Sequence, residues 1–245
     1  MQSRKKKQSR MPRILFTFII LLVLGTVGTA AFLVCRVQAV AVEGISRFTQ
    51  EQIISISGIQ TDDSMFMLNE AAVCSAIQKD PYVKSAKIER QFPDTVKITI
   101  VERVPAALVQ YVDSFLKMDR DGYILEKTDD AAGESCPVIT GMNVTAFQIG
   151  QPIKSQDPKQ VDVYTSILSK LDGSTTAGDI AEINVANLEN VYLLTRGNIR
   201  IRIGSISDLD RKFVWIQNVL PILIQQGKSG GTLDVTNPES ASYIP

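Results

Sequence analysis

The longest apolar stretch of the chain lies near its N-terminus and predicts a membrane-spanning helix. Ile14, Leu24 and Val34 mark the start, middle and end of a run of 21 residues without a charged side chain. As a helix the run would reach about 30 Å, the thickness of the hydrocarbon core of a bilayer. The tail before it, residues 1–13, has six basic and no acidic residues. Because basic residues beside a span stay in the cytoplasm, we expect an internal N-terminus and an extracytoplasmic remainder.

The apolar run has three alternative interpretations: a cleaved signal peptide, a lipoprotein site and a buried helix of a soluble core. A cleaved signal peptide has a shorter apolar core of about 7–15 residues, although residues 39–41, Ala-Val-Ala, could serve as a cleavage site. A lipoprotein site at Cys35 would need small residues before it, whereas Leu33 and Val34 precede it. A buried helix of a soluble core is disfavoured because the run has no polar face.

The spacing of apolar residues over about the next 70 residues, with signals for helix starts and turns, predicts a small α/β domain. Residues 37–43 alternate as a strand would. Thr49 and Gln52 have the spacing of a capping box at the start of a helix. Asn69 is suited to cap a second helix, which Pro81 would end.

Two strands with strong alternation follow these helices. They cover residues 83–90 and 96–103, and the sequence Phe-Pro-Asp-Thr at 92–95 is typical of the turn between them. The predicted order is therefore strand, helix, helix, strand, strand.

The remainder predicts a larger domain with a mostly antiparallel sheet, which makes the whole chain α+β. Asp157 followed by Pro158 is typical of a helix start. A second helix is expected from Ser207, and Pro221 is expected to kink or end it. The expected strands cover residues 108–112, 115–118, 123–126, 180–185, 191–195, 199–203 and 232–236.

Composition argues against several classes of function. The chain has 26 basic and 26 acidic residues, and six of the basic ones lie in the tail, so residues 14–245 carry a net charge of about −6. No basic stripe points to nucleic acid. The absence of histidine removes the usual general base and the commonest zinc ligand. We expect no metal, no cofactor and no small-molecule substrate.

The three cysteines, Cys35, Cys74 and Cys136, lack the spacing of a metal site. A disulfide between Cys74 and Cys136 is conceivable outside the cell, and two separate buried thiols are the simpler interpretation.

Three short motifs suggest a catalytic, calcium or phosphate site, but each lacks the secondary structure or the ligands that its chemistry needs. Ser114 and Lys117 have the Ser-x-x-Lys spacing of penicillin-recognising enzymes, but they fall in a predicted strand, where such positions face opposite sides. Residues 119–122 resemble a calcium loop that lacks two ligands, so a turn is expected. Residues 227–229 resemble a phosphate loop but follow a helix instead of preceding one. We therefore expect no catalytic residues, and a membrane-anchored hydrolase is disfavoured.

Several short motifs, in this order and spacing, are similar to those of one family. They lie at residues 40–44, 81–83, 90–96, 102–105, 121–122, 137–141, 211–212 and 233–238. Together with the basic tail and single span, they resemble the FtsQ/DivIB proteins of bacterial cell division, and the short N-terminus is more similar to the DivIB branch. The resemblance implies a polypeptide-transport-associated (POTRA) domain after the span.

The domain boundaries expected from pattern and resemblance are a cytoplasmic tail at 1–13, a span at 14–34, a POTRA-like domain at 37–105, an FtsQ/DivIB-type β domain at 106–238 and a short C-terminal tail at 239–245. The resemblance implies a non-enzymatic scaffold in the septal membrane. Its implied partners are FtsL and FtsB or DivIC, and a septal peptidoglycan synthase is a further candidate.

The last predicted strand is the candidate partner-binding site. If it lies at a sheet edge, it offers unpaired backbone groups to an extended partner segment, and Tyr243 and Ile244 would add apolar contact. Alternatively, residues 240–245 cover that edge themselves or are frayed. The strand comprises Thr232, Leu233, Asp234, Val235 and Thr236.

A second contact is expected near Gly44, Arg47 and Phe48, on position alone. A POTRA-type receptor of a transport complex is the alternative function, although such receptors usually carry several copies of the domain. A sensor of cell-wall fragments is a further alternative.

Overall fold

The computed structural model describes residues 13–131 and 134–245, in two compact units. Unit 1 comprises residues 1–78 and 85–102, and unit 2 comprises residues 79–84 and 103–245. The basic tail expected at 1–13 lies outside the described residues, except for Arg13.

The apolar run forms helix α1, Arg13–Val34. Its large apolar side chains, such as Phe16, Leu21 and Leu24, are exposed wherever the structure describes them. Over the described residues, however, no helix has both the length and the apolar character needed to cross a bilayer. The membrane span at residues 14–34 therefore stays a prediction.

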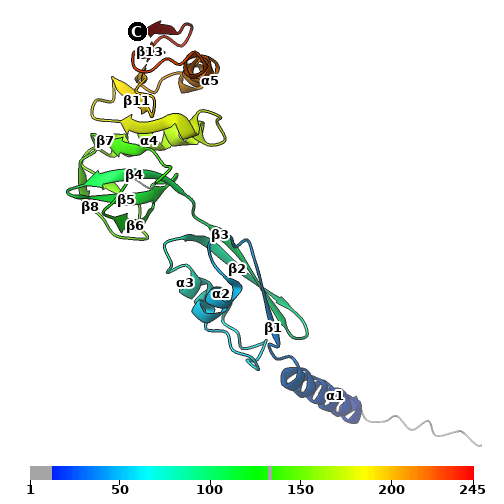
Figure 1. Ribbon diagram of the computed structural model, residues 1–245. Coiled ribbons are helices and arrows are strands. Elements are labelled where there is room, and N and C mark those ends of the chain that lie inside the picture. The colour runs from blue at the N-terminus through cyan, green and yellow to red at the C-terminus, as the bar shows by residue number, and fades with distance from the viewer. Residues whose placement is uncertain (1–12, 132–133) are drawn as a thin grey trace, which may run out of the picture. The chain divides into compact units, whose positions relative to one another are not determined.

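Unit 1 has the predicted order of elements. A three-stranded sheet of order β1-β3-β2 is formed by β1 Ala39–Glu43, β2 Val83–Gln91, whose first two residues belong to unit 2, and β3 Thr95–Glu102. The helices α2, Gln50–Ser57, and α3, Glu70–Ile77, lie against this sheet (Figure 1). Strand β1 runs parallel to β3, with Val40 opposite Val96.

The predicted starts of α2 and α3 are confirmed by the hydrogen bonds of their capping side chains. The Thr49 hydroxyl accepts a hydrogen bond from the Gln52 backbone N–H at 3.2 Å, and the Gln52 side chain accepts one from the Thr49 N–H at 2.8 Å. Asn69 accepts a bond from the N–H of Ala72. These bonds satisfy backbone donors that a helix start leaves unpaired.

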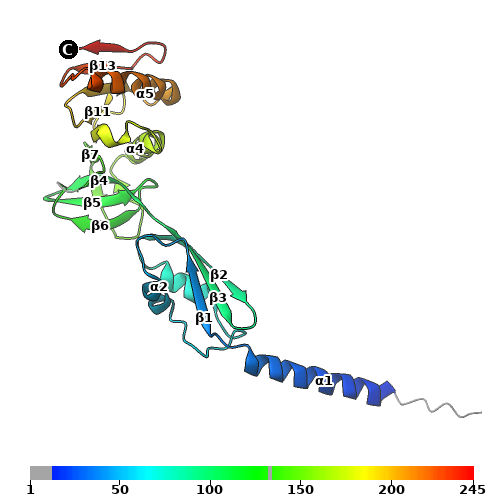
Figure 2. The same cartoon turned by 45° about the vertical axis from the view of Figure 1, so that its right-hand side comes forward.

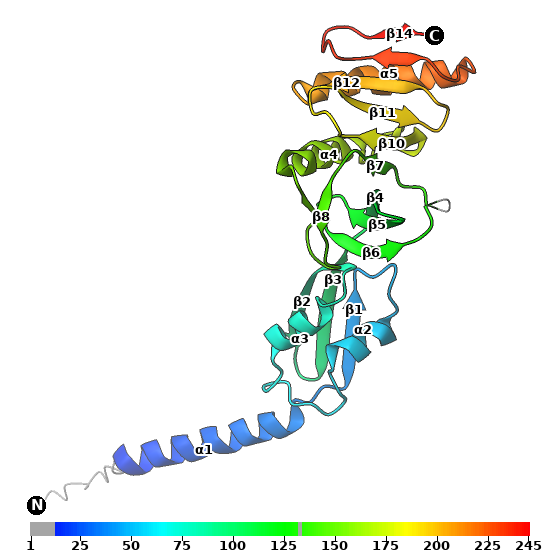
Figure 3. The same ribbon diagram turned by 90° about the vertical axis from the view of Figure 1, so that its left-hand side faces the viewer.

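Unit 2 is built on a nine-stranded sheet of order β14-β13-β12-β11-β10-β7-β4-β5-β6 (Figure 3). Five of its neighbouring pairs are antiparallel and three are parallel, as predicted for a mostly antiparallel sheet. The strands are β4 Pro105–Tyr111, β5 Ser114–Asp119, β6 Ile124–Thr128, β7 Val138–Thr140, β10 Ile180–Asn184, β11 Val191–Thr195, β12 Arg200–Gly204, β13 Thr232–Asp234 and β14 Ser242–Ile244.

Two helices complete unit 2 by covering the sheet. Buried side chains of α4, Pro158–Leu171, and α5, Leu209–Gln225, form one core with alternate strand residues such as Val109, Leu193 and Ile201. Asp157 caps α4 as predicted, since its carboxylate accepts from the N–H of Lys159. Short elements lie outside the sheet: strands β8 Val144–Ala146 and β9 Lys154–Ser155, which pair with each other, and a 3₁₀ turn at Ala177–Asp179.

Two expectations about the C-terminal region are wrong. The cap of α5 is Asp208, in the left-handed conformation, while the Ser207 hydroxyl lies 2.8 Å from that of Ser205. Of the two outcomes expected at Pro221, a kink or an end of the helix, the end does not occur: α5 continues to Gln225, and Leu220 and Leu223 are buried on either side of the proline. Burial of these side chains outweighs the one hydrogen bond that proline removes.

The second correction concerns the sheet edge. Strand β13 lies between β12 and β14, so residues 232–234 are internal. Residues 239–245 are not a free tail, because they contain the edge strand β14. The alternative in which the C-terminal residues cover the edge is therefore the one that the structure adopts.

The cysteines Cys35, Cys74 and Cys136 are free thiols and only partly buried. The disulfide considered from the sequence is absent, and Cys74 and Cys136 are two separate thiols, as the simpler interpretation had it, although each is only partly buried.

Candidate functional site

The C-terminal edge of the unit 2 sheet is the candidate site for a partner strand. Strand β14 is held against β13 with Tyr243 opposite Leu233 and Ile244 opposite Thr232. The Tyr243 hydroxyl donates a hydrogen bond to the carbonyl of Gly230 at 3.0 Å. Leu233 is fully buried, so the edge rests on the core.

The hydrogen bonds of β13 determine which backbone groups of β14 face outward. The N–H of Val235 donates to the Arg202 carbonyl, and the Gly231 carbonyl accepts from the N–H of Arg200, each at 3.0 Å. Because backbone direction alternates along a strand, odd-numbered residues of β13 face β12 and even-numbered residues face β14.

The strand partners of these even-numbered residues, Ser242 and Ile244, must therefore point their backbone groups inward. It follows that the N–H and C=O of Tyr243 point away from the sheet.

The edge offers a modest amount of binding energy. Two backbone hydrogen bonds at Tyr243 contribute about 2 kcal/mol, at about 1 kcal/mol each. Covering Ile244, which is 59% exposed, adds about 1 kcal/mol. A micromolar complex needs about 8 kcal/mol. A partner strand at this edge must therefore make further contacts elsewhere.

The predicted site residues 232–236 lie on the inner side of the edge strand β14, between it and β12. Asp234 lies 3.3 Å from the Arg202 guanidinium, and its carboxylate accepts from the N–H and hydroxyl of Thr236. Burial acts to raise the pKa of Asp234, but these bonds outweigh it and the pKa is lowered. The charged Asp234 therefore links β13 to β12 through its ion pair with Arg202.

The second predicted contact, at residues 44–48, forms a tightly held corner of unit 1. The Glu102 carboxylate accepts hydrogen bonds from the backbone N–H groups of Ser46, Arg47 and Phe48 at 3.0, 3.0 and 3.3 Å. Gly44 has a φ of 80°, and a Cβ there would collide with the Ile100 carbonyl. The N–H groups of residues 46–48 are therefore already used within the fold and cannot donate to a partner strand, and the contact stays a prediction.

Burial acts to raise the pKa of Glu102, but the donors around its carboxylate outweigh that effect and lower the pKa from 4.5. The charged carboxylate is therefore part of the fold of this corner.

The residues of the Ser-x-x-Lys motif do not form a catalytic pair. The Ser114 hydroxyl donates to the carbonyl of Tyr111. The Lys117 ammonium lies 2.7 Å from Glu126 and 2.6 Å from Glu134, and these carboxylates outweigh the effect of burial and raise its pKa. A lysine held in this way is a poor general base.

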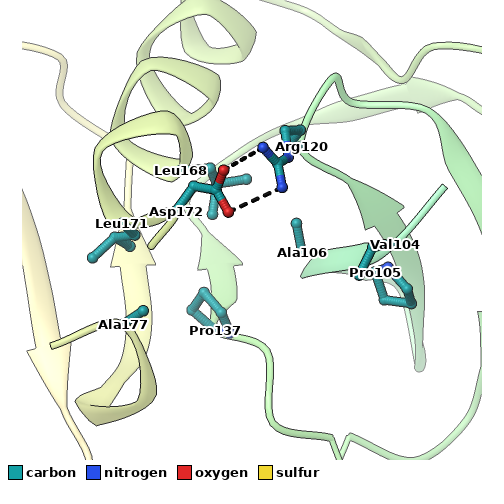
Figure 4. A pocket seen from close by; sticks show the side chains of 9 residues that line it. All are labelled: Val104, Pro105, Ala106, Arg120, Pro137, Leu168, Leu171, Asp172 and Ala177. Atoms are coloured by element: carbon teal, nitrogen blue, oxygen red, sulfur yellow. Dashed lines mark hydrogen bonds and ion pairs between the residues drawn. The ribbon is translucent and has the colours of Figure 1, made fainter. Parts of the chain in front are cut away.

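Unit 2 also contains a small apolar cavity of about 180 Å³, in which Arg120 and Asp172 form a two-pronged ion pair (Figure 4). Its other lining residues are Val104, Pro105, Ala106, Pro137, Leu168, Leu171 and Ala177. Arginine and aspartate neutralise each other there, so the cavity presents no reactive group. Across residues 13–131 and 134–245, no three potential metal ligands come together.

Comparison with known proteins places this fold in the class of POTRA-containing cell-division proteins. The family model described as POTRA domain, FtsQ-type, matches residues 35–103. The cell division protein DivIB of Clostridium tetani (strain Massachusetts / E88) is 30% identical over 196 residues, covering 80% of this chain and 72% of the relative. The cell division protein FtsQ of Anaeromyxobacter sp. (strain K) is 27% identical, covering 85% of this chain and 70% of the relative.

A solved structure, the major extracytoplasmic domain of DivIB from Geobacillus stearothermophilus, has 17% identity and a TM-score of 0.32, covering 49% of this chain and 96% of that domain. On the evidence of its sequence relatives, the chain belongs to the FtsQ/DivIB family of cell division proteins.

Proposed function

We propose that this protein is a non-enzymatic scaffold of the bacterial division septum. It binds FtsL and FtsB or DivIC through its extracytoplasmic units and helps to control septal peptidoglycan synthesis, with a septal peptidoglycan synthase as a further partner. The observation that carries the proposal is the edge strand β14, where the backbone of Tyr243 points outward. The curated relatives, named as cell division proteins, support the division role.

The polar chemistry of the described residues favours binding over catalysis. The groups that resembled a catalytic pair, Ser114 and Lys117, each have other partners. The alternative function, a receptor in a transport complex, is not favoured by the relatives.

Membrane anchoring by residues 14–34 is part of the proposal. The absence of charge in the run and the exposure of apolar side chains such as Phe16 and Leu21 support it. Flotation of the full chain with lipid vesicles tests the anchor directly. Recovery of the chain in the dense, lipid-free fraction would exclude it.

The binding edge is tested by two substitutions at one residue. Tyr243→Pro removes the outward N–H and crowds an incoming strand, whereas Tyr243→Ala loses the side chain but keeps the backbone donor. Because 1.4 kcal/mol corresponds to a tenfold change, we expect Tyr243→Pro to bind an FtsL–FtsB or FtsL–DivIC complex about tenfold more weakly than Tyr243→Ala. Equal affinities, measured by interferometry on immobilised full-length chain, would show that the partner docks elsewhere.

Val235→Pro is a poor test of the same idea. The N–H of Val235 already bonds Arg202 inside the sheet, so that substitution would damage the fold itself.

In cells, depletion of the protein should produce filaments without septa. Normal septation with a defect in protein export would favour the transport receptor instead.

A further inference from the structure

Three exposed phenylalanine rings from distant segments of unit 1 gather where the C-terminal end of α1 meets the sheet domain. Phe32 belongs to α1, Phe66 to the loop between α2 and α3, and Phe92 to the turn between β2 and β3. The ring centroids of Phe32 and Phe66 lie 6.3 Å apart, and those of Phe66 and Phe92 lie 5.4 Å apart. Met67, next to Phe66, is 75% exposed. We call Phe32, Phe66, Met67 and Phe92 the aromatic cluster.

Backbone hydrogen bonds hold the aromatic cluster beside the end of the apolar run. The Cys35 carbonyl accepts from the N–H of Met65 at 3.1 Å, one residue after α1 ends at Val34. Val37 exchanges two bonds with the same loop: its N–H donates to Asp63, and its carbonyl accepts from Asp62. Figure 2 shows this loop and the β2–β3 turn beside the C-terminal end of α1.

The β2–β3 turn is attached to the same segment. The Asp94 carbonyl accepts from the N–H groups of Gln38 and Ala39 at 2.8 and 3.3 Å. Phe92, two residues earlier, is 55% exposed. The cluster is thus fixed by main-chain bonds and does not depend on how the rings themselves pack.

We propose that the aromatic cluster docks on the surface of the lipid bilayer. The inference rests on the proposed anchor at residues 14–34. Cys35 follows that run directly, so the residues bonded to Cys35 and Val37 must lie where the chain leaves the hydrocarbon. Aromatic and other large apolar side chains at this level gain by burial among the headgroups and upper acyl chains.

Charge near the cluster limits how deeply it enters. Asp62, Asp63 and Asp94 flank it, and protein donors hold their carboxylates: Gln38 bonds Asp62, the Gln60 N–H bonds Asp63, and the Thr95 hydroxyl bonds Asp94. Charged groups are costly within the hydrocarbon, so only the rings and Met67 enter the interface. The consequence is that unit 1 is held at the membrane surface by two attachments, the anchor and the cluster.

The test uses indole fluorescence in the full chain reconstituted into vesicles of phosphatidylcholine and phosphatidylglycerol brominated near the headgroup. Bromine quenches only indoles that reach the lipid. Phe66→Trp and Met67→Trp place reporters in the cluster, and Val101→Trp is the matched control, since Val101 is 50% exposed in the same unit. The parent chain, with its single tryptophan, supplies the background.

We expect brominated vesicles to quench much of the emission added by Phe66→Trp and Met67→Trp and none of that added by Val101→Trp. If the chain floats with the vesicles but neither cluster reporter is quenched, the lipid contact is wrong while the anchor stands; a protein partner would then be the occupant. Equal quenching of all three reporters would overturn the specific contact. Failure to float would overturn the anchor and the contact with it.

Met67→Trp guards against a folding defect of Phe66→Trp, because Met67 is largely exposed and its replacement leaves all three phenylalanine rings in place. Far-ultraviolet circular dichroism of each variant establishes that it is folded before quenching is measured.

Discussion

Asp119→Ala should destabilise unit 2 more than any single surface substitution. The Asp119 side chain is buried, and one carboxylate oxygen accepts from the Arg103 guanidinium at 2.5 Å. The other accepts from the N–H groups of Asp121 and Tyr123 at 3.0 and 2.8 Å. The guanidinium also lies 3.7 Å from the centre of the Tyr123 ring.

The expected loss in the free energy of unfolding follows from the unpaired groups that Asp119→Ala creates. Arg103 would lose its buried carboxylate partner and keep only the partly exposed Asp121 at 3.8 Å, and breaking one partner of a buried pair costs about 3–5 kcal/mol. Asp121→Asn is the comparison with an exposed carboxylate: Asp121 is 41% exposed, pairs with Lys84 and lies 3.8 Å from Arg103, so the loss of its charge should cost at most about 1 kcal/mol.

A double substitution separates the charge from the packing. Arg103→Met with Asp119→Leu replaces the pair by apolar side chains of similar size, and such replacements are often close to neutral. We therefore expect the double variant to be at least about 1 kcal/mol more stable than Asp119→Ala.

Urea unfolding of the full chain measures these differences. The single tryptophan, Trp215, lies on α5 and therefore reports unit 2. A loss below about 1 kcal/mol for Asp119→Ala, the range of an exposed pair, would refute the claim that this carboxylate organises the turn.

Three further predictions concern single positions. Gly141→Ala should destabilise unit 2 by more than about 2 kcal/mol in the same assay, because φ is 76° and the new Cβ would lie 2.5 Å from that of Ala186; a neutral result would mean that the neighbouring loop moves freely. Glu102→Gln should speed amide exchange at residues 46–48. Since the folded pKa of Glu102 is lowered from 4.5, its contribution is present above that pH and is lost as pH falls through the folded value; unit 1 of the parent chain, but not of Glu102→Gln, should show this loss in an acid titration. Thr49→Ala should cost about 1 kcal/mol through loss of the capping box, measured by thermal unfolding against Thr49→Ser, which keeps the hydroxyl.

Features decided by neighbours in sequence were predictable. The starts of α2, α3 and α4 depend on one side chain and an N–H two or three residues away, so Thr49, Asn69 and Asp157 reveal them. Alternation likewise located β2 and β3 to within a few residues. The cap of α5 escaped this reasoning because Asp208 is left-handed and makes no side-chain cap bond.

The candidate site shows the limit of such local signals. The sequence proposes residues 232–236, Tyr243 and Ile244 as a partner-binding region, but which strand forms the sheet edge depends on pairing between distant segments. Strands β7 and β14 have only three residues each, too few for a periodic pattern.

Sequence alone was enough to locate the apolar run, the order of elements in unit 1 and the starts of α2, α3 and α4, because each depends on residues a few positions apart. Only the tertiary structure decided that β14 closes the sheet, that the backbone of Tyr243 points outward and that Phe32, Phe66 and Phe92 meet. Strand order and ring contacts arise from long-range hydrogen bonding and shared burial, and no local pattern encodes which distant segments satisfy each other.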